Sequence, residues 1–262
     1  MRAGRVAAAL ALLFLAGCTS PSVARDPGLP PTSAVTGSPG PSVSAATRSP
    51  ALTGDPTAGS AIRTRFAGRI SRIPHPIARE MRGTTWKPRC PVPMSDLRLL
   101  RFNYVGFDGK VKRGPMIVHE DVAANVLGVF RELFEARFPI KRVALAREFV
   151  PEEFQSRISS RRSVTAAFNC RTVVTPLGPG ETFSQHAYGL AIDLNPVQNP
   201  FVTADGFVRN RMARPYVDRS EDMTGMIHGG DVVVRAFEAI GWSWGGRWSG
   251  GKDYMHFSRT GR

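Results

Sequence analysis

Residues 184–196 read SQHAYGLAIDLNP, and the interpretation of the whole chain depends on this stretch. It contains His186 and Asp193, with Gly189 between them to let the chain bend. Over residues 191–194 apolar and polar side chains alternate, so in a strand Asp193 faces away from the core that its neighbours enter. A lone aspartate on a strand is usually solvated or paired with an arginine. The nearby histidine makes a metal site the sharper alternative.

A second fragment near the C-terminus supplies another acid and another histidine. Residues 253–257 read DYMHF, which places Asp253 three positions before His256. On a turn this spacing brings the two side chains to neighbouring positions, whereas a regular strand would send them to opposite faces. The glycine-rich residues 245–251 argue against a plain strand. Two histidines and one carboxylate are the minimal protein ligand set of a catalytic zinc, which predicts a zinc hydrolase with the remaining acid as base.

Together the two fragments resemble a known family. The pattern SxHxxGxAxD over residues 184–193, followed by DxxH over residues 253–256, is similar to that of the zinc peptidases of bacterial cell-wall metabolism. These include the VanY-type D-alanyl-D-alanine carboxypeptidases, the D-Ala-D-Ala dipeptidases and the L-alanyl-D-glutamate endopeptidases of phage lysins. The resemblance covers residues 86–257. It implies the α+β fold shared with the hedgehog signalling domain, an antiparallel sheet flanked by helices in a single catalytic domain.

The resemblance also assigns the metal ligands and the base. His186, Asp193 and His256 look like the ligands of a Zn²⁺ ion. Asp253 stands where the family places its catalytic acid, which is Glu in many members and Asp in others. By this resemblance, zinc lowers the pKa of its bound water, and Asp253 takes the proton and delivers it to the leaving amine.

Three further residues are expected to act on the substrate. The family uses an arginine upstream of the first histidine to stabilise the developing oxyanion, and Arg171 is our candidate. Arg161 and Arg162 are rivals, because the subfamilies place this arginine differently. Ser184 is expected to contact substrate, as its family counterpart does. Trp248 is the tryptophan expected to line the cleft, while the two tryptophans before it are assigned to the core.

The function implied is a zinc metallopeptidase of the D,D-carboxypeptidase type, which removes the terminal D-Ala of peptidoglycan stem peptides. One alternative is an L-alanyl-D-glutamate endopeptidase of the same family, since specificity lies in the loops. The other is a non-catalytic, zinc-containing module that binds the cell wall, which the presence of Asp253 disfavours. We expect a monomer.

The N-terminus predicts export. Arg2 and Arg5 precede an apolar run over residues 6–16, which is shorter than the about 20 residues that a spanning helix needs. The run ends in LAGC, which resembles the bacterial lipoprotein box, so residues 1–18 are interpreted as a signal peptide with Cys18 as the lipidated residue. An ordinary secretory signal with an incidental cysteine is the alternative. Both place the protein outside the cytoplasm, either anchored to the bacterial membrane by lipid or secreted.

The next segment has the composition of a tether. Residues 19–60 are rich in Pro, Ser, Thr, Gly and Ala and contain no aromatic residue. Such a segment buries too little apolar surface to offset the entropy of ordering it, so we expect it to be disordered. Residues 61–262 then form the peptidase domain, since about 200 residues suffice for one domain with a real core.

Charge and cysteines give weaker predictions. The formal net charge of +14 comes mostly from arginines spread along the chain. No module with interleaved basic and aromatic residues accompanies it, so attraction to anionic lipid headgroups and wall polymers is favoured over nucleic acid as a partner. Beside Cys18 the chain has Cys90 and Cys170, which we expect to form a disulfide in an oxidising compartment. Two buried free thiols, or two metal ligands, are the alternatives.

The secondary-structure pattern is mixed. Residues 97–107 and 111–118 flank an Asp-Gly turn and predict a hairpin. Helical spacing of apolar residues predicts a helix over 119–137 and a second over 232–240, with Asp231 as its cap and Gly241 in the left-handed position after it. Further elements are expected as follows: a lead-in with one short helix at 62–82, strands at 140–149 and 165–174, and loops at 201–230. Without a regular strand–helix alternation, an α+β fold with an antiparallel sheet is favoured.

Overall fold

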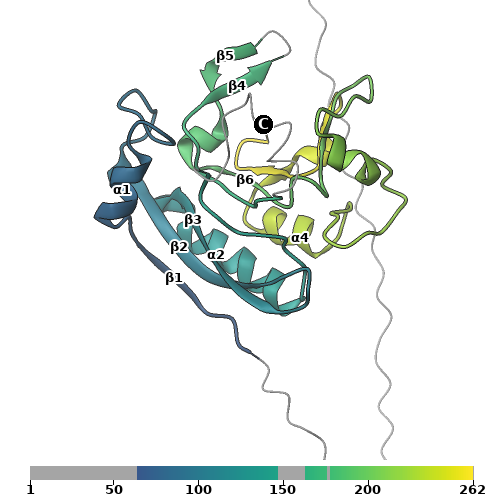
Figure 1. The fold of residues 1–262 in the computed structure, drawn as a ribbon, viewed down its shortest axis with the longest axis horizontal. Helices are drawn as coiled ribbons and strands as arrows, with labels where there is room; N and C mark the ends of the chain where they lie inside the picture. The colour runs from purple at the N-terminus through teal and green to yellow at the C-terminus, as the bar shows by residue number, and fades with distance from the viewer. Residues whose placement is uncertain (1–63, 147–162, 176–177, 262) are drawn as a thin grey trace, which may run out of the picture. The chain divides into compact units, whose positions relative to one another are not determined.

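A three-stranded antiparallel sheet covered by one long helix opens the fold (Figure 1). The computed structural model describes residues 64–146, 163–175 and 178–261, all within the unit Ser60–Arg262. The sheet has the order β1-β2-β3 and is followed by helix α2. Its members are β1 (Gly68–Arg72), β2 (Leu97–Val105), β3 (Val111–His119) and α2 (Glu120–Glu135). The predicted signal peptide, lipidation at Cys18 and tether lie outside the described residues and remain predictions.

Alternation in β2 determines which face α2 covers. Leu100 and Phe102 are fully buried and belong to the main core together with the apolar side of α2. The ring of Phe102 stacks on that of Phe130 in α2, with centroids 4.3 Å apart. Leu97 and Leu99 point to the other face of the sheet, where they enter a second cluster. The predicted hairpin is confirmed, since β2 and β3 pair from Leu97↔His119 to Val105↔Val111.

A smaller antiparallel sheet carries the C-terminal residues. Its order is β6-β10-β8, formed by β6 (Ala191–Asp193), β10 (His256–Ser258) and β8 (Ser243–Trp244). Helix α4 (Val232–Ala239) packs on it through Phe237, whose ring stacks on that of Phe257 at 4.2 Å. The Asp231 carboxylate accepts a hydrogen bond from the amide of Val234, so the predicted cap of α4 is confirmed.

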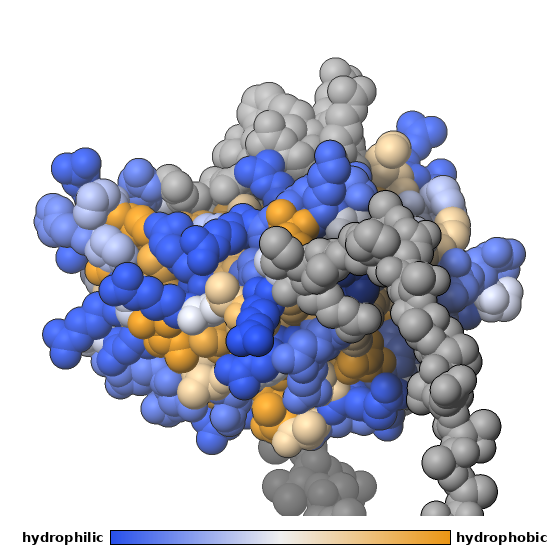
Figure 2. Space-filling model, turned by 90° about the horizontal axis from the view of Figure 1, so that it is seen from below, coloured by the Kyte–Doolittle hydropathy of each residue, from blue (hydrophilic) through white to orange (hydrophobic). Residues whose placement is uncertain are grey.

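Short elements make up the rest of the described fold. They are α1 (His75–Met81), η1 (Met94–Asp96), β4 (Thr172–Thr175) with β5 (Gly178–Phe183), η4 (Gln185–Tyr188), β7 (Phe201–Val202) with β9 (Lys252–Asp253), η5 (Arg211–Tyr216) and η6 (Gly245–Arg247). Within the described ranges, no helix has the length and apolar character needed to cross a membrane. The face drawn in Figure 2 is mainly hydrophilic, with small apolar patches between the polar residues.

The α+β class is confirmed, whereas one expected strand is absent over its described residues and another is shorter than expected. Over residues 140–146 the chain forms only an isolated bridge, Val143↔Thr165. The strand expected at 165–174 begins only at Thr172, because Thr165 pairs with Val143 whereas the next residue, Ala166, pairs with Asp193. Changing partners at successive residues prevents a ladder. Strand β1 falls within the predicted lead-in and was missed.

The disulfide between Cys90 and Cys170 is present, with Cα atoms 5.9 Å apart. It joins the irregular segment before β2 to the segment that leads toward η4. The amide of Cys170 also donates to the carbonyl of Thr85, which adds a second link at the same place. The predicted pairing is confirmed, and the bridge restrains the residue next to it, Arg171.

Candidate metal centre and active site

His186 is presented by the short turn η4. The turn begins with Ser184, whose hydroxyl accepts a hydrogen bond from the amide of His186 at 3.4 Å. It ends with Gly189 in the left-handed conformation, φ 69°. A Cβ at Gly189 would lie 2.5 Å from the backbone nitrogen of His119, so both conformation and space require glycine here. The motif residues on either side of His186 therefore shape the turn that carries it.

A backbone carbonyl fixes the orientation of the His186 ring. Its Nδ1 atom lies 2.7 Å from the carbonyl oxygen of Ala167, which accepts a hydrogen bond from it. The proton is thereby held on Nδ1, and the lone pair of Nε2 is left free. Ala167 was not singled out in the sequence, because any residue can supply a carbonyl. Only the fold shows that this one does.

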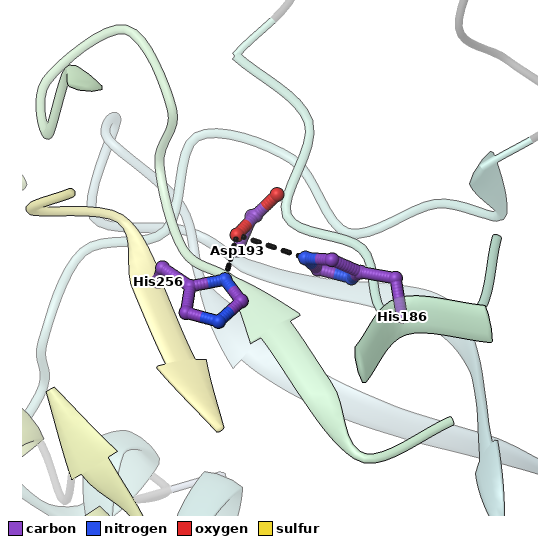
Figure 3. A group of neighbouring side chains, drawn as sticks. All are labelled: His186, Asp193 and His256. Carbon is purple, nitrogen blue, oxygen red and sulfur yellow. Dashed lines mark hydrogen bonds and ion pairs between the residues drawn. The ribbon is translucent and has the colours of Figure 1, made fainter. Parts of the chain in front are cut away.

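Asp193 and His256 are brought together by the pairing of β6 with β10. They are directly opposite each other in the antiparallel register, so their side chains lie on the same side of the sheet. Ala166 pairs with the backbone of Asp193 from the other side, in both directions. Figure 3 shows the carboxylate of Asp193 between the rings of His186 and His256. One ligand atom from each of these three residues lies within 4.8 Å of the others.

The three residues fit a metal ion. Oδ1 of Asp193 lies 3.3 Å from Nε2 of His186 and 3.1 Å from Nδ1 of His256. Ligands bound tetrahedrally at about 2.0–2.1 Å would be about 3.3 Å apart, so these spacings match. The buried Nε2 of His186 has no hydrogen bond in the described structure, and its lone pair faces a carboxylate oxygen. That contact is favourable only with a proton or a cation between the two atoms.

The electrostatics of Asp193 agree with a cation site. Burial by itself would raise the pKa of this carboxyl. When protonated, the imidazoles of His186 and His256 outweigh burial through their charges and hydrogen bonds and hold the pKa well below its usual range. Asp193 is therefore ionised at every physiological pH and available as a ligand. Its side chain keeps 23% of its surface exposed, which leaves an approach from outside.

A turn between two short strands holds Asp253 beside the cluster. Strand β9 ends at Asp253 and β10 begins at His256, with a turn between them, as expected from the glycine-rich approach. Strand β9 pairs with β7 through Phe201↔Asp253. Gly245 packs directly on Asp253, and a Cβ there would lie 2.5 Å from the Asp253 carbonyl oxygen. The turn lets both Asp253 and His256 act at one site.

The environment of Asp253 differs from that of Asp193. Burial and the negative charge of Asp193 raise the pKa of Asp253 to about 7, against smaller lowering effects from His256 and Arg171. Its Oδ1 atom is buried without a hydrogen-bond partner in the described residues. Two neighbouring carboxyls with pKa values pushed apart are typical of a division between an ionised ligand and a proton carrier.

The remaining expected residues lie around this cluster. Arg171 is exposed and close enough to lower the pKa of Asp253, although its Nη1 donates to the carbonyl of Thr172. Trp248 is half-buried, and its ring centroid lies 5.6 Å from that of His256. Ser184 is buried beneath the His186 turn as its cap. The rival arginines, 161 and 162, lie outside the described residues.

A buried polar network next to the site was missed in the sequence. Asn199 donates to the carbonyl of Asn195, close to β6, and accepts a hydrogen bond from Arg219 at 3.1 Å. The Arg219 guanidinium lies over the ring of Tyr254, 4.5 Å from its centroid. The network thus connects the segment after Asp193 with the residue after Asp253. One weak signal was available, the two asparagines at 195 and 199, each followed directly by a proline.

The comparisons with known proteins bear on this site. Residues 178–259 match the family model described as D-alanyl-D-alanine carboxypeptidase. The matched segment contains the three clustered residues and Asp253, so the resemblance seen in the motifs is confirmed over this segment. Peptidases of this family are zinc-dependent, and the match supports a metallopeptidase that acts on peptidoglycan. The wider resemblance over residues 86–177 remains a prediction. No curated protein and no solved structure matches the chain.

Proposed function

We propose that the chain is a zinc-dependent D,D-carboxypeptidase that hydrolyses the bond before the terminal D-Ala of peptidoglycan stem peptides. The observation that carries this proposal is the arrangement of Asp253 beside the cluster of His186, Asp193 and His256, all within the segment matched by the peptidase family. We also propose the hedgehog/DD-peptidase architecture for the α+β fold. An extracytoplasmic location, with Cys18 as the lipid anchor, completes the proposal.

The protein residues divide the chemistry as follows. A zinc ion bound by His186, Asp193 and His256 would act as a Lewis acid toward the substrate carbonyl and lower the pKa of the attacking water. The Asp253 carboxylate accepts one proton from that water as its oxygen bonds to the carbonyl carbon. When the carbon–nitrogen bond breaks, Asp253 returns the proton to the departing D-Ala amine. Atoms and charge then balance, and Asp253 is regenerated.

Three residues assist without exchanging protons. Arg171 is our candidate to stabilise the negative charge that develops on the carbonyl oxygen, a contribution of about 3–4 kcal/mol for a well-aligned donor. The Ala167 carbonyl holds the His186 proton on Nδ1 and so keeps Nε2 available as a ligand. Trp248 borders His256 and is our candidate for contact with the peptide.

Digestion of purified peptidoglycan tests the specificity. The D,D-carboxypeptidase releases free D-alanine, whereas an L-alanyl-D-glutamate endopeptidase would create new N-terminal D-Glu. Mass spectrometry of the released fragments distinguishes the two. Binding to the polymer without any release would instead favour the non-catalytic module. The Asp253→Asn variant serves as the matched control, because it changes one carboxyl to an amide of the same shape.

A further inference from the structure

A hollow of about 400 Å³ lies on strands β1 and β2, and three arginines line it. Arg69 and Arg101 are directly opposite each other in the antiparallel register, so both side chains lie on one face of the sheet. It is the face opposite to α2, because the alternate residues of β2 enter the core with that helix. Arg72, Ser71, Pro74 and Leu99 complete the lining.

These arginines have no acidic partner in the described part of the chain. None of its ion pairs includes Arg69, Arg72 or Arg101, whereas the neighbouring Arg98 is paired with Glu120. All three unpaired arginines are exposed. Like charges directly opposite each other on two strands destabilise a sheet. An anion supplied from outside would remove that repulsion.

Protection of a sheet edge accounts for only part of the pattern. Strand β1 is an edge strand, and charged residues on an edge strand discourage pairing with other chains. That explanation covers Arg69 and Arg72. It does not cover Arg101, which lies on the central strand β2 and still points into the same hollow. The convergence of arginines from both strands on one hollow favours ligand binding.

Phosphate is an anion that this lining suits. A guanidinium presents its donors as a planar fork that matches phosphate oxygens, and several such forks around one hollow can bind more than one oxygen at once. Exposed arginines on one face of a sheet also complement a surface that carries many phosphates. We propose that this groove binds the phosphates of anionic phospholipid headgroups and holds the domain against a membrane surface.

Vesicle binding tests the proposal independently of peptidase activity, so its failure would not affect the proposed function. The full chain carrying Cys18→Ser, which removes the predicted lipidation, is mixed with phosphatidylglycerol-containing vesicles or with pure phosphatidylcholine vesicles. We expect salt-sensitive binding to the anionic vesicles alone. A triple variant, Arg69→Ser, Arg72→Ser and Arg101→Ser, should bind about fivefold more weakly per arginine removed, roughly a hundredfold in total.

A second triple variant controls for net charge. Arg211→Ser, Arg214→Ser and Arg259→Ser removes the same charge from exposed positions outside the groove. We expect this control variant to weaken vesicle binding by less than a tenth of the fold-change seen with the groove variant. Equal loss in both variants would show that net charge alone drives binding and would overturn the proposal, as would no loss in either. Thermal unfolding of both variants verifies that each is folded.

Competition identifies the source of the phosphate. Inorganic phosphate is added at constant ionic strength to the complex with anionic vesicles. A membrane-binding groove should keep its vesicles, because many headgroups act together on one surface. Displacement by inorganic phosphate, under conditions where chloride at the same ionic strength leaves the vesicles bound, would instead identify a site for a single free phosphate. That outcome would contradict the assignment to lipid.

Discussion

The two ring nitrogens of His186 have different environments, and this difference determines what the side chain can do. Nδ1 bonds the carbonyl of Ala167, while Nε2 faces Asp193 without a hydrogen. Histidines that bind metals commonly have their second nitrogen held in this way, which fixes the tautomer before the metal arrives. The site is thus prepared for a cation by the backbone as well as by the ligands.

Removal of one ligand should remove the metal. We expect His186→Ala or His256→Ala to weaken zinc binding by more than about a hundredfold, the upper range already reached when only an outer partner is lost. His75→Ala is the matched control, since His75 is exposed and lies outside the cluster. Zinc content after dialysis gives the answer. Full retention of zinc in both site variants would exclude this ligand set.

The raised pKa of Asp253 predicts that the metal-free protein loses folding stability as the pH rises. Its pKa of about 7 in the folded state exceeds the ordinary value of 3.8, so the folded protein binds this proton more tightly than the unfolded chain. Stability from this group is complete below pH 4 and is lost as the pH rises through 7. Asp253→Asn should therefore stabilise the metal-free protein at pH 8, by up to about 4 kcal/mol, and have little effect at pH 4.

Urea unfolding of both proteins at the two pH values measures this difference. The comparison is made after chelation, because a bound dication favours the charged carboxylate and would lower the pKa. A gain in stability that is equal at both pH values would contradict the assigned pKa. A loss at pH 8 would show that the charged form of Asp253 is stabilised in the folded protein.

At the scale of elements, the site depends on two loops more than on regular strands. The turn between β9 and β10 separates Asp253 from His256, and the segment after β6 is fixed by the network of Asn199 and Arg219. Arg219 donates to the carbonyls of Gln198 and Tyr216, both at 3.0 Å. A single cation therefore links backbone segments that no sheet connects.

Arg219→Met should destabilise the fold by about 2–4 kcal/mol, since it keeps the apolar stem but leaves several acceptors without a donor. The free energy of unfolding in urea checks the magnitude. Arg211→Met is the matched control and should change stability by less than about 0.5 kcal/mol, because Arg211 is exposed. If the two variants were equally stable, the network around Arg219 would not contribute to the stability of the fold.

The disulfide is the second device that replaces regular structure. It closes a loop between Cys90 and Cys170, with a sequence separation of 80. A bridge across a loop of this length lowers the conformational entropy of the unfolded chain and so raises the free energy of unfolding by about 4 kcal/mol. We expect the double variant Cys90→Ser, Cys170→Ser to lose stability of that order. Unfolding of the wild type with and without reductant is the independent check, and insensitivity to reductant would contradict the prediction.

For the whole molecule, local patterns predicted those parts of the fold that local forces determine. The hairpin around Asp108-Gly109 and the cap of α4 follow from residues close in sequence, and both were predicted. Strand β1 could not be predicted in this way. Its sequence, GRISR, has little apolar character, and it becomes a strand only by pairing with β2.

The candidate site was predictable to the extent that its residues form compact motifs. The spacing of His186 and Asp193, and of Asp253 and His256, gave only a weak signal for each pair, and the resemblance to a known family joined the two pairs into one predicted site. The carbonyl of Ala167 and the stacking of Arg219 on Tyr254 were not predictable, because they depend on contacts between distant segments. Backbone groups have no sequence signature, and one arginine looks like any other in a chain with a net charge of +14.

The most direct test of the central claim is the rate at which D-alanine is released from a peptide ending in D-Ala-D-Ala, measured against bound zinc. We expect the rate to rise in proportion to zinc occupancy. Asp253→Asn should retain zinc yet release D-alanine about 10²–10⁴-fold more slowly, the range for loss of a general base. Release that survives complete removal of zinc, or that is unchanged in Asp253→Asn, would contradict the account.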